Sequence, residues 1–301
     1  MARPDLPRFL QFLEFDTNVS RNTVKAYESD IKQFFSFNDK QNVELSWLGA
    51  LAYLSFLRDV KHSSDNTIKR RLASMRRFFH FLEESGLLTD PRLSKIGLRF
   101  RTPFRLPRVM PLSDVSRLLQ AAERKGGSTT YQRYKRVRDH LILSMLFYTG
   151  MRVGEVVGLV SADIEMESGT VRVHGKGGKE RILYIRNRKL GLGLRQHAKL
   201  RSRVHPHTEA LFINRAGNRL SSRSVEQLFH MYLRRAGIVG EYTPHTMRHT
   251  MATALLERGT NIRTLQETLG HASILSTQIY THVAPRQVEE ALAMLGRARL
   301  E

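Results

Sequence analysis

Apolar residues recur at helical spacing along most of this 301-residue chain, and this periodicity constrains its fold more than any other feature. The spacing predicts helices over residues 7–15, from about 20, from about 46, 64–86, 112–122, 140–148, about 187–203, about 221–236, in three short pieces within 243–282, and about 287–297. Gly259 and Gly270 stand where helix C-termini favour a residue that tolerates positive φ. We expect Ser113 or Asp114 to cap the helix that reaches Ala122. The chain should therefore be mainly α-helical.

One stretch predicts strands instead. Residues 163–166, 170–174 and 181–185 are short alternating runs, separated by Ser168-Gly169 and by the Gly-Lys-Gly-Gly turn at 175–178. They predict a three-stranded antiparallel sheet. The fold class is therefore mainly α with a small antiparallel β-sheet, with the α+β part in the second half of the chain.

The helical pattern breaks between Ile96 and Pro111, where the sequence holds three prolines and four arginines. Such a segment is typical of an extended, basic linker between domains. We expect two domains, residues 1–106 and 107–301. A second basic segment, residues 124–138, is predicted to be a loop that runs into the next helix.

The net charge of +21 is the strongest compositional signal. Residues 1–106 hold 18 Lys and Arg against 12 Asp and Glu, and residues 107–301 hold 31 against 16, so both parts are basic. A polyphosphate partner explains such an excess, because each neutralised phosphate releases counterions. A ribosome-associated protein or a merely basic surface is the alternative.

Other classes are excluded by what the sequence lacks. The chain has no cysteine, which removes thiol catalysis, disulfides and cysteine zinc sites. It has neither an apolar run long enough for a membrane span nor a signal-peptide pattern at its N-terminus. We expect a soluble cytoplasmic protein without a membrane partner, associated with the nucleoid when it is bound to DNA.

Basic residues on the helix at 64–86 are candidates for contact with DNA phosphates. No acidic residue interrupts the helix between Asp65 and Glu83, whereas an ordinary solvated face, which is the alternative, mixes charges of both signs. The candidate DNA-binding residues here, in the linker and in the second hairpin are Lys69, Arg70, Arg71, Arg76, Arg77, Arg101, Arg105, Lys179 and Arg181.

Chemistry-bearing residues are concentrated between Thr243 and His282, where short helices carry His245, Arg248, His249, His271 and Tyr280. A phosphodiester transfer without metal needs permanently charged, bidentate donors for the phosphate oxygens. It also needs a proton donor for the leaving oxygen and a nucleophile such as a phenolate.

Outside that stretch, Arg152 follows a Thr-Gly-Met turn and Lys176 lies in a glycine-rich turn. Taken singly, each of these residues has an ordinary structural explanation. His245 and His249 have the i,i+4 spacing of metal ligands, but no partner ligand is evident and Arg248 would stand beside the cation. We therefore expect no metal and no other cofactor.

The order of these motifs resembles the tyrosine recombinase family, also called lambda-type integrases, and within it the Xer-like bacterial recombinases. The motifs are T-G-M-R-V-G-E at 149–155, H-G-K-G-G-K-E-R at 174–181, H-T-M-R-H at 245–249, L-G-H-A-S at 269–273 and I-Y-T-H at 279–282. Residues 20–106 look like the family's N-terminal, SAM-like core-binding domain. Met247 stands where the family most often has leucine, a swap that conserves volume.

The resemblance implies a role for each matching residue. Arg152 and Arg248 would clamp the scissile phosphate, and Lys176 would be the general acid for the 5′-hydroxyl leaving group. Tyr280 would attack phosphorus and form a 3′-phosphotyrosyl bond. His245 would assist proton transfer at the nucleophile.

Three further roles follow from the same resemblance. His271 would donate a hydrogen bond to a non-bridging oxygen. Glu155 would orient the cationic side chains, and His249 would support the site structurally.

The same resemblance implies a site-specific DNA recombinase that works as a two-domain, C-shaped clamp on double-stranded DNA carrying a specific site. Four copies, or a hetero-tetramer with a second recombinase, would exchange strands, with the helix at about 287–297 docked on a neighbour. Accessory DNA-bending proteins are possible partners. The alternatives are relaxation of DNA in the manner of a type IB topoisomerase, and a DNA-binding regulator without activity.

Overall fold

The computed structural model describes residues 6–15, 19, 21–87, 92, 108–123, 126–175 and 178–270. The chain divides into two compact units, Met1–Phe104 and Arg105–Glu301, and each is described here by itself. Both are mainly α-helical, and a small antiparallel sheet belongs to the second, which confirms the expected fold class. Within the described part of the chain, no helix is long and apolar enough to cross a membrane.

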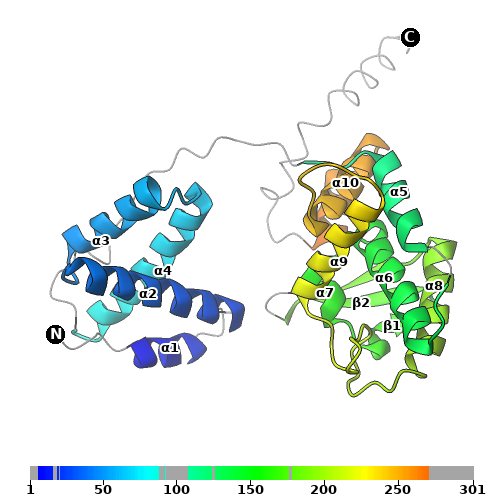
Figure 1. Ribbon diagram of the computed structural model, residues 1–301, viewed down its shortest axis with the longest axis horizontal. Coiled ribbons are helices and arrows are strands. Elements are labelled where there is room, and N and C mark those ends of the chain that lie inside the picture. The colour runs from blue at the N-terminus through cyan, green and yellow to red at the C-terminus, as the bar shows by residue number, and fades with distance from the viewer. Residues whose placement is uncertain are drawn as a thin grey trace, which may run out of the picture. The chain divides into compact units, whose positions relative to one another are not determined.

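The first unit is a bundle of helices around an aromatic core (Figure 1, blue to cyan). Its elements are α1 (Leu6–Phe15), α2 (Arg21–Gln41), α3 (Trp47–Ser55), a π-helical turn (Phe56–Val60) and α4 (Asp65–Glu84). Ser46 and Ser64 cap α3 and α4, since their hydroxyls accept the backbone N–H groups of Gly49 and Thr67 at 3.2 and 3.3 Å.

Aromatic rings in edge-to-face and tilted contact run through the core of the first unit. Phe9 of α1 meets Phe78 of α4 edge to face, with ring centroids 5.1 Å apart. Phe34 of α2 contacts both Tyr53 of α3 and Phe79 of α4, at 5.2 and 6.0 Å. Such ring pairs stabilise a core by about 0.5–1.5 kcal/mol each beyond the area they bury.

In its described residues, the second unit packs most of its helices and a sheet around one main core, and a smaller core lies beside it (Figure 1, green to orange). Its described elements are α5 (Leu112–Glu123), α6 (Thr130–Tyr148), α7 (Val153–Gly158), a 3₁₀ turn (Ser161–Asp163), β1 (Ile164–Glu165), β2 (Thr170–His174), β3 (Glu180–Tyr184), α8 (Arg188–Arg201), α9 (Ser222–Arg235), α10 (Pro244–Glu257) and α11 (Ile262–Leu269).

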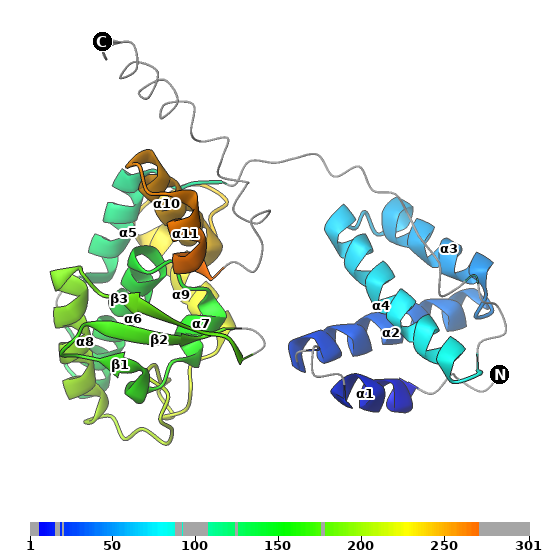
Figure 2. The same cartoon turned by 180° about the vertical axis from the view of Figure 1, so that it is seen from behind.

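The sheet has the order β1-β2-β3, and all of its pairs are antiparallel (Figure 2). Val171, Val173 and Leu183 point inward and join the main core. Arg172 pairs with Ile182 in the register, and both side chains are exposed on the other face. The sheet therefore has one packed face and one face open to solvent.

Helix α6 corrects the prediction of a basic loop over residues 124–138, because residues from Thr130 onward are helical. Thr129 and Gln132 form a reciprocal capping box that starts the helix. Arg138 is buried and donates to the carbonyl of Ile213 at 2.7 Å and to its neighbour Asp139 at 2.7 Å. The basic character of this segment thus partly reflects inward ion pairs.

Smaller differences concern helix and strand ends. Helix α5 begins at Leu112, so Ser113 and Asp114 lie inside its first turn and do not cap it. Strand β3 begins and ends one residue earlier than predicted, at Glu180 and Tyr184. Helix α7 was not expected. The predicted domain boundary at 106/107 and the predicted helix at 287–297 lie outside the described residues.

Candidate active site

Three of the six predicted catalytic residues lie in the described part of the second unit. Arg152 directly precedes α7, and His245 and Arg248 lie near the N-terminus of α10. The predicted supporting residues Glu155 and His249 belong to the same two helices. The other three predicted catalytic residues, Lys176, His271 and Tyr280, lie outside the described residues.

Helix α10 begins at Pro244 after an N-cap at Thr243. Because positions i, i+3 and i+4 share one helix face, His245 lies above Arg248 and His249. The first turn of a helix also presents backbone N–H groups and the positive end of the helix dipole, which favour an anion. This end of α10 therefore combines two imidazoles, a guanidinium and a helix N-terminus.

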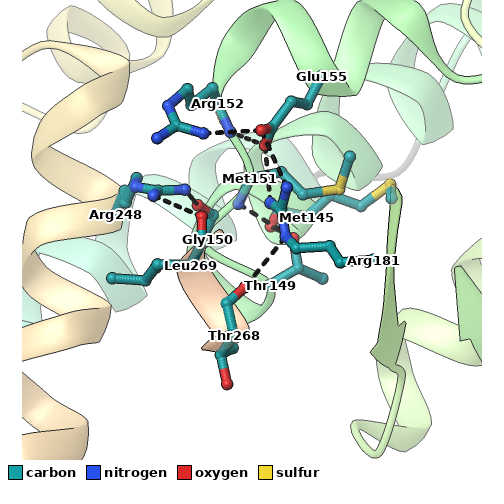
Figure 3. Close-up of polar contacts among 10 residues, drawn as sticks. All are labelled: Met145, Thr149, Gly150, Met151, Arg152, Glu155, Arg181, Arg248, Thr268 and Leu269. Atoms are coloured by element: carbon teal, nitrogen blue, oxygen red, sulfur yellow. Dashed lines mark hydrogen bonds and ion pairs between the residues drawn. The ribbon is translucent and has the colours of Figure 1, made fainter. Parts of the chain in front are cut away.

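Arg248 is only 4% exposed, and main-chain oxygens hold its guanidinium. Its Nη1 donates to the carbonyl of Gly150 at 2.5 Å, and its Nη2 donates to that of Leu269 at 2.7 Å (Figure 3). Gly150 has φ +61°, which favours glycine, and a Cβ there would also displace the Cε end of Met251, 2.1 Å away. Arg248 thus ties the segment before Arg152 to the C-terminal end of α11.

Glu155 stands between two arginines (Figure 3). Its Oε1 accepts from Arg152 Nη1 at 2.9 Å and from Arg181 Nη1 at 3.0 Å. Its Oε2 accepts the backbone N–H of Arg152 at 2.9 Å and Arg181 Nη2 at 2.8 Å. Burial alone would raise the pKa of Glu155, but the hydrogen bonds from Arg181 and Arg152 hold that pKa below its ordinary value of 4.5. The carboxylate is therefore charged at neutral pH.

Arg181 was predicted from sequence as a DNA contact, and that role stays a prediction. Its side chain is 14% exposed, and its Nε donates to the carbonyl of Thr268 at 3.1 Å while both Nη atoms bind Glu155. Sequence reasoning missed this ion pair, because no local spacing links two residues 26 positions apart.

Both histidines of α10 have a lowered pKa, which favours their neutral forms. Desolvation, together with the positive charges of Arg248 and Arg152, lowers the pKa of His245 below 6.5. Desolvation and the neighbouring His245 and Arg248 likewise lower the pKa of His249. The positive charges of both arginines therefore act on the pKa of the same imidazole, that of His245. A neutral imidazole in this place can accept a proton.

His174, the last residue of β2, contacts two carboxylates where the hairpin between β2 and β3 begins. Its Nε2 lies 2.9 Å from Asp163 Oδ1, and its Nδ1 lies 2.9 Å from Glu180 Oε1. The hydrogen bond with Asp163 is the main cause of a raised pKa at His174. Sequence reasoning did not single out this cluster. Lys176 follows His174 by two positions in the chain.

The candidate DNA-binding residues of α4 fall into different environments. Arg70 forms an ion pair with buried Asp30, and Arg71 donates to Tyr53 Oη and to Gln33 Oε1, both at 2.8 Å. The guanidinium of Arg77 lies 5.0 Å from the ring centroid of Phe12.

The other candidate DNA-binding residues differ in exposure and in whether the structure describes them. Arg76 and Lys179 are exposed, and Lys69 is half-buried. Arg101 and Arg105 lie outside the described residues. The proposed contacts of all these residues with DNA stay predictions.

Metal ligation has no support among the residues that the structure describes, where no group of three or more His, Asp or Glu side chains could hold an ion. His245 and His249 have Arg248 beside them, which opposes a cation.

The sequence matches two family models. Residues 108–287 match the phage integrase family, and residues 6–86 match the phage integrase N-terminal SAM-like domain. The tyrosine recombinase XerD of Listeria innocua is 34% identical over 296 residues, which cover 94% of this chain and 95% of the relative.

Two similar solved structures support the fold. A XerH site-specific recombinase bound to its palindromic difH substrate, in a post-cleavage complex, has a TM-score of 0.71 at 22% identity and covers 97% of this chain and 85% of its own. A lambda integrase tetramer bound to a Holliday junction has a TM-score of 0.64 at 19% identity, with coverage of 91% and 75%.

Proposed function

Because the chain belongs to the phage integrase family and is a tyrosine-type site-specific recombinase, we propose that it cleaves and rejoins DNA strands through a covalent 3′-phosphotyrosyl intermediate, without metal or nucleotide. One observation carries this proposal. Arg248 of α10 bonds the carbonyl of Gly150, two residues before Arg152, so that the two guanidiniums lie in one part of the second unit with His245 one turn before Arg248, and Glu155 is bound to Arg152. This arrangement suits an oxyanion of phosphorus.

The proposed cleavage step is an in-line displacement at the scissile phosphorus. The phenolic oxygen of Tyr280 bonds to phosphorus as the bond from phosphorus to the 5′-oxygen breaks. His245 accepts the phenolic proton, and Lys176 gives a proton to the departing 5′-oxygen. Rejoining reverses the step, with a 5′-hydroxyl as the nucleophile and the phenolate as the leaving group. The covalent bond keeps the energy of the phosphodiester, so no external energy source is needed.

The role proposed for Arg152 and Arg248 is to stabilise the negative charge of the transition state. The transition state carries extra negative charge on the non-bridging oxygens, and guanidinium groups bind such oxygens without losing their protons. His271 would add a hydrogen bond to the same oxygens. The support for Lys176, His271 and Tyr280 is their place in the family motifs at 174–181, 269–273 and 279–282.

Strand exchange requires more than one copy, because each cleaved strand must meet the 5′-hydroxyl of another duplex. We propose a tetramer on two double-stranded sites, by analogy with the lambda integrase tetramer on a Holliday junction. The helix predicted at 287–297 would join neighbouring copies. The tetramer could consist of one chain type or of two, and a second recombinase or a DNA-bending protein could take part.

A strand-exchange assay tests the proposal. The cognate site is first selected from a random duplex library by binding, and two labelled duplexes that carry it are then incubated with the protein in EDTA. Recombinant strands with the expected junction support the proposal. A type IB topoisomerase activity would instead relax plasmids without a defined site and without pairing of copies, and that result would contradict the proposed exchange.

A further inference from the structure

We propose that Arg181 is a positioning residue of the active site, which acts through Glu155 on Arg152 and holds the C-terminal end of α11, and that it is not a DNA contact. This inference rests on the proposed phosphate-binding role of Arg152. The residue comes from β3, whereas Glu155 belongs to α7 and Thr268 to α11, so its side chain joins three elements (Figure 3).

The pairing of Arg181 with Glu155 is bidentate. Nη1 and Nη2 each donate to one carboxylate oxygen, at 3.0 and 2.8 Å. The same two oxygens receive the side chain and the backbone N–H of Arg152. Two parallel bonds fix the plane of a carboxylate as well as its position, which the single ammonium of a lysine cannot do. The orientation of Glu155, and with it that of Arg152, therefore depends on Arg181.

The remaining donor of Arg181 serves α11. Its Nε donates to the carbonyl of Thr268 at 3.1 Å, and Arg248 donates to the next carbonyl, that of Leu269. The last carbonyls of a helix have no partner within the helix and need one from elsewhere. Two arginines from different elements thus supply partners for consecutive carbonyls, directly before the residues that lead to His271.

Close packing around Gly270 supports this assignment. Gly270 ends α11 with φ +64°, and a Cβ there would lie 3.0 Å from Nη1 and 3.2 Å from Cδ of Arg181. The guanidinium is therefore covered on this side by the turn that ends α11. Both Nη atoms of Arg181 bind the carboxylate of Glu155, which offsets its positive charge, whereas Arg248 donates to two neutral carbonyls. Arg181 is therefore poorly placed to bind a DNA phosphate.

Loss of Arg181 would act on the reaction through geometry. Arg152 is 41% exposed, and its side chain is held by Glu155. Without Arg181 the carboxylate can rotate, and Arg152 moves with it. A displacement of about 1 Å in a catalytic group can lower a rate about 100-fold.

The test combines four variants, Arg181→Ala, Arg181→Lys, Arg172→Ala and Arg152→Ala, with two substrates. Arg181→Ala removes the bonds to Glu155 and to the carbonyl of Thr268. Arg181→Lys keeps the charge but loses the bidentate pair with Glu155. Arg172→Ala removes an exposed arginine from the adjacent strand and serves as the matched control. Each is given a nicked duplex that traps the cleaved strand, with a normal phosphate or with an uncharged methylphosphonate at the scissile position.

We expect Arg181→Ala to cleave about 100-fold more slowly at saturating DNA, with its dissociation constant and salt dependence unchanged. Arg172→Ala should cleave at nearly the normal rate. An uncharged phosphorus centre depends less on cationic side chains. On the methylphosphonate, the ratio of the normal cleavage rate to that of Arg152→Ala should therefore be smaller by about 10-fold or more. The same ratio for Arg181→Ala should fall with it. Rescue of both variants supports the inference.

Other results overturn it. Weaker DNA binding with a salt slope reduced by about 1, and a normal rate at saturation, would make Arg181 a DNA contact. Rescue of Arg152→Ala without rescue of Arg181→Ala would give Arg181 a purely structural role. If the methylphosphonate rescues neither, the proposed role of Arg152 fails as well. Should Arg181→Ala fail to fold in a thermal melt, Arg181→Lys decides by the same comparison.

Discussion

The guanidinium of Arg248 donates a hydrogen bond to the main-chain oxygen of Leu269 at 2.7 Å, across 21 positions of the chain. Its second bond reaches the carbonyl of Gly150, two residues before Arg152. A residue proposed to bind the scissile phosphate therefore also organises the segments that carry other parts of the site. Activity and local stability should be coupled at this position.

Replacement of Arg248 by lysine tests that coupling. Lysine keeps the charge but cannot bond both carbonyls in the same plane, so at least one buried acceptor loses its partner. We expect the free energy of unfolding to fall by about 1–3 kcal/mol, measured by urea denaturation. Arg263→Lys, an exposed change on α11, is the control and should leave the value unchanged. An equal effect of both changes would contradict the structural role of Arg248.

The lowered pKa of His245 predicts the acid side of the pH profile. Desolvation and the nearby arginines favour the neutral ring, so His245 should still accept a proton somewhat below pH 6.5. The midpoint of the acid limb of single-turnover cleavage should therefore lie below pH 6.5. His245→Asn should be slow and should lose this limb. If the acid limb of the profile is centred above pH 6.5 and persists in His245→Asn, a titrating group other than His245 causes it.

His174 predicts a pH dependence of stability with the opposite sign. Its pKa is raised in the folded protein, so its contribution is fully present below 6.5 and is lost as the pH rises through the raised pKa. Urea midpoints measured from pH 6 to 9 should therefore fall more steeply for the unchanged protein than for His174→Asn. His230→Asn, which alters an exposed histidine on α9, should keep the steeper fall. Parallel curves for all three proteins would show that the pairs with Asp163 and Glu180 contribute nothing.

Asp30 predicts where the first unit is most sensitive to the loss of a charge. It is 1% exposed, pairs with Arg70 and accepts the hydroxyl of Ser74 at 2.7 Å. Because Arg70 is partly solvated, Asp30→Asn should cost about 1–3 kcal/mol and not the larger value of a fully buried pair. Thermal and urea unfolding of the chain would measure it.

Glu28→Gln is the control for Asp30→Asn, since Glu28 pairs with Lys32 at the surface of the same helix. Exposed pairs of this kind contribute about 0–1 kcal/mol. A larger loss for Glu28→Gln than for Asp30→Asn would contradict the assignment of Asp30 as the key acid.

Local signals predicted the elements well where side-chain chemistry and spacing agree. Ser46 and Ser64 cap their helices as such residues do, and Gly259 and Gly270 have φ +86° and +64° as their positions at helix ends require. Strand β2 has the predicted bounds of Thr170–His174. These features depend on a few neighbouring residues, which a sequence shows directly.

Long-range pairings could not be predicted in the same way. The charges within 124–138 indicated a loop because nothing local shows that Arg138 turns inward to Asp139 and Ile213. Likewise, the sequence alone shows Arg181 as one more basic residue. Its pairing with Glu155 becomes evident only from the fold, which places β3 beside that side chain of α7. The sequence indicates which side chains could do chemistry, whereas the fold decides which of them hold the others.

The most direct test of the central claim is to map the covalent adduct on a nicked suicide duplex that carries the selected site. The nick lets a short 5′-hydroxyl fragment diffuse away after cleavage, so the protein stays attached to the DNA. We predict that digestion and mass spectrometry, after reaction in EDTA, find the DNA fragment on Tyr280, and that Tyr280→Phe binds the duplex normally but forms no adduct. An adduct on another residue, an adduct that persists in Tyr280→Phe, or cleavage that requires a divalent metal would contradict the account.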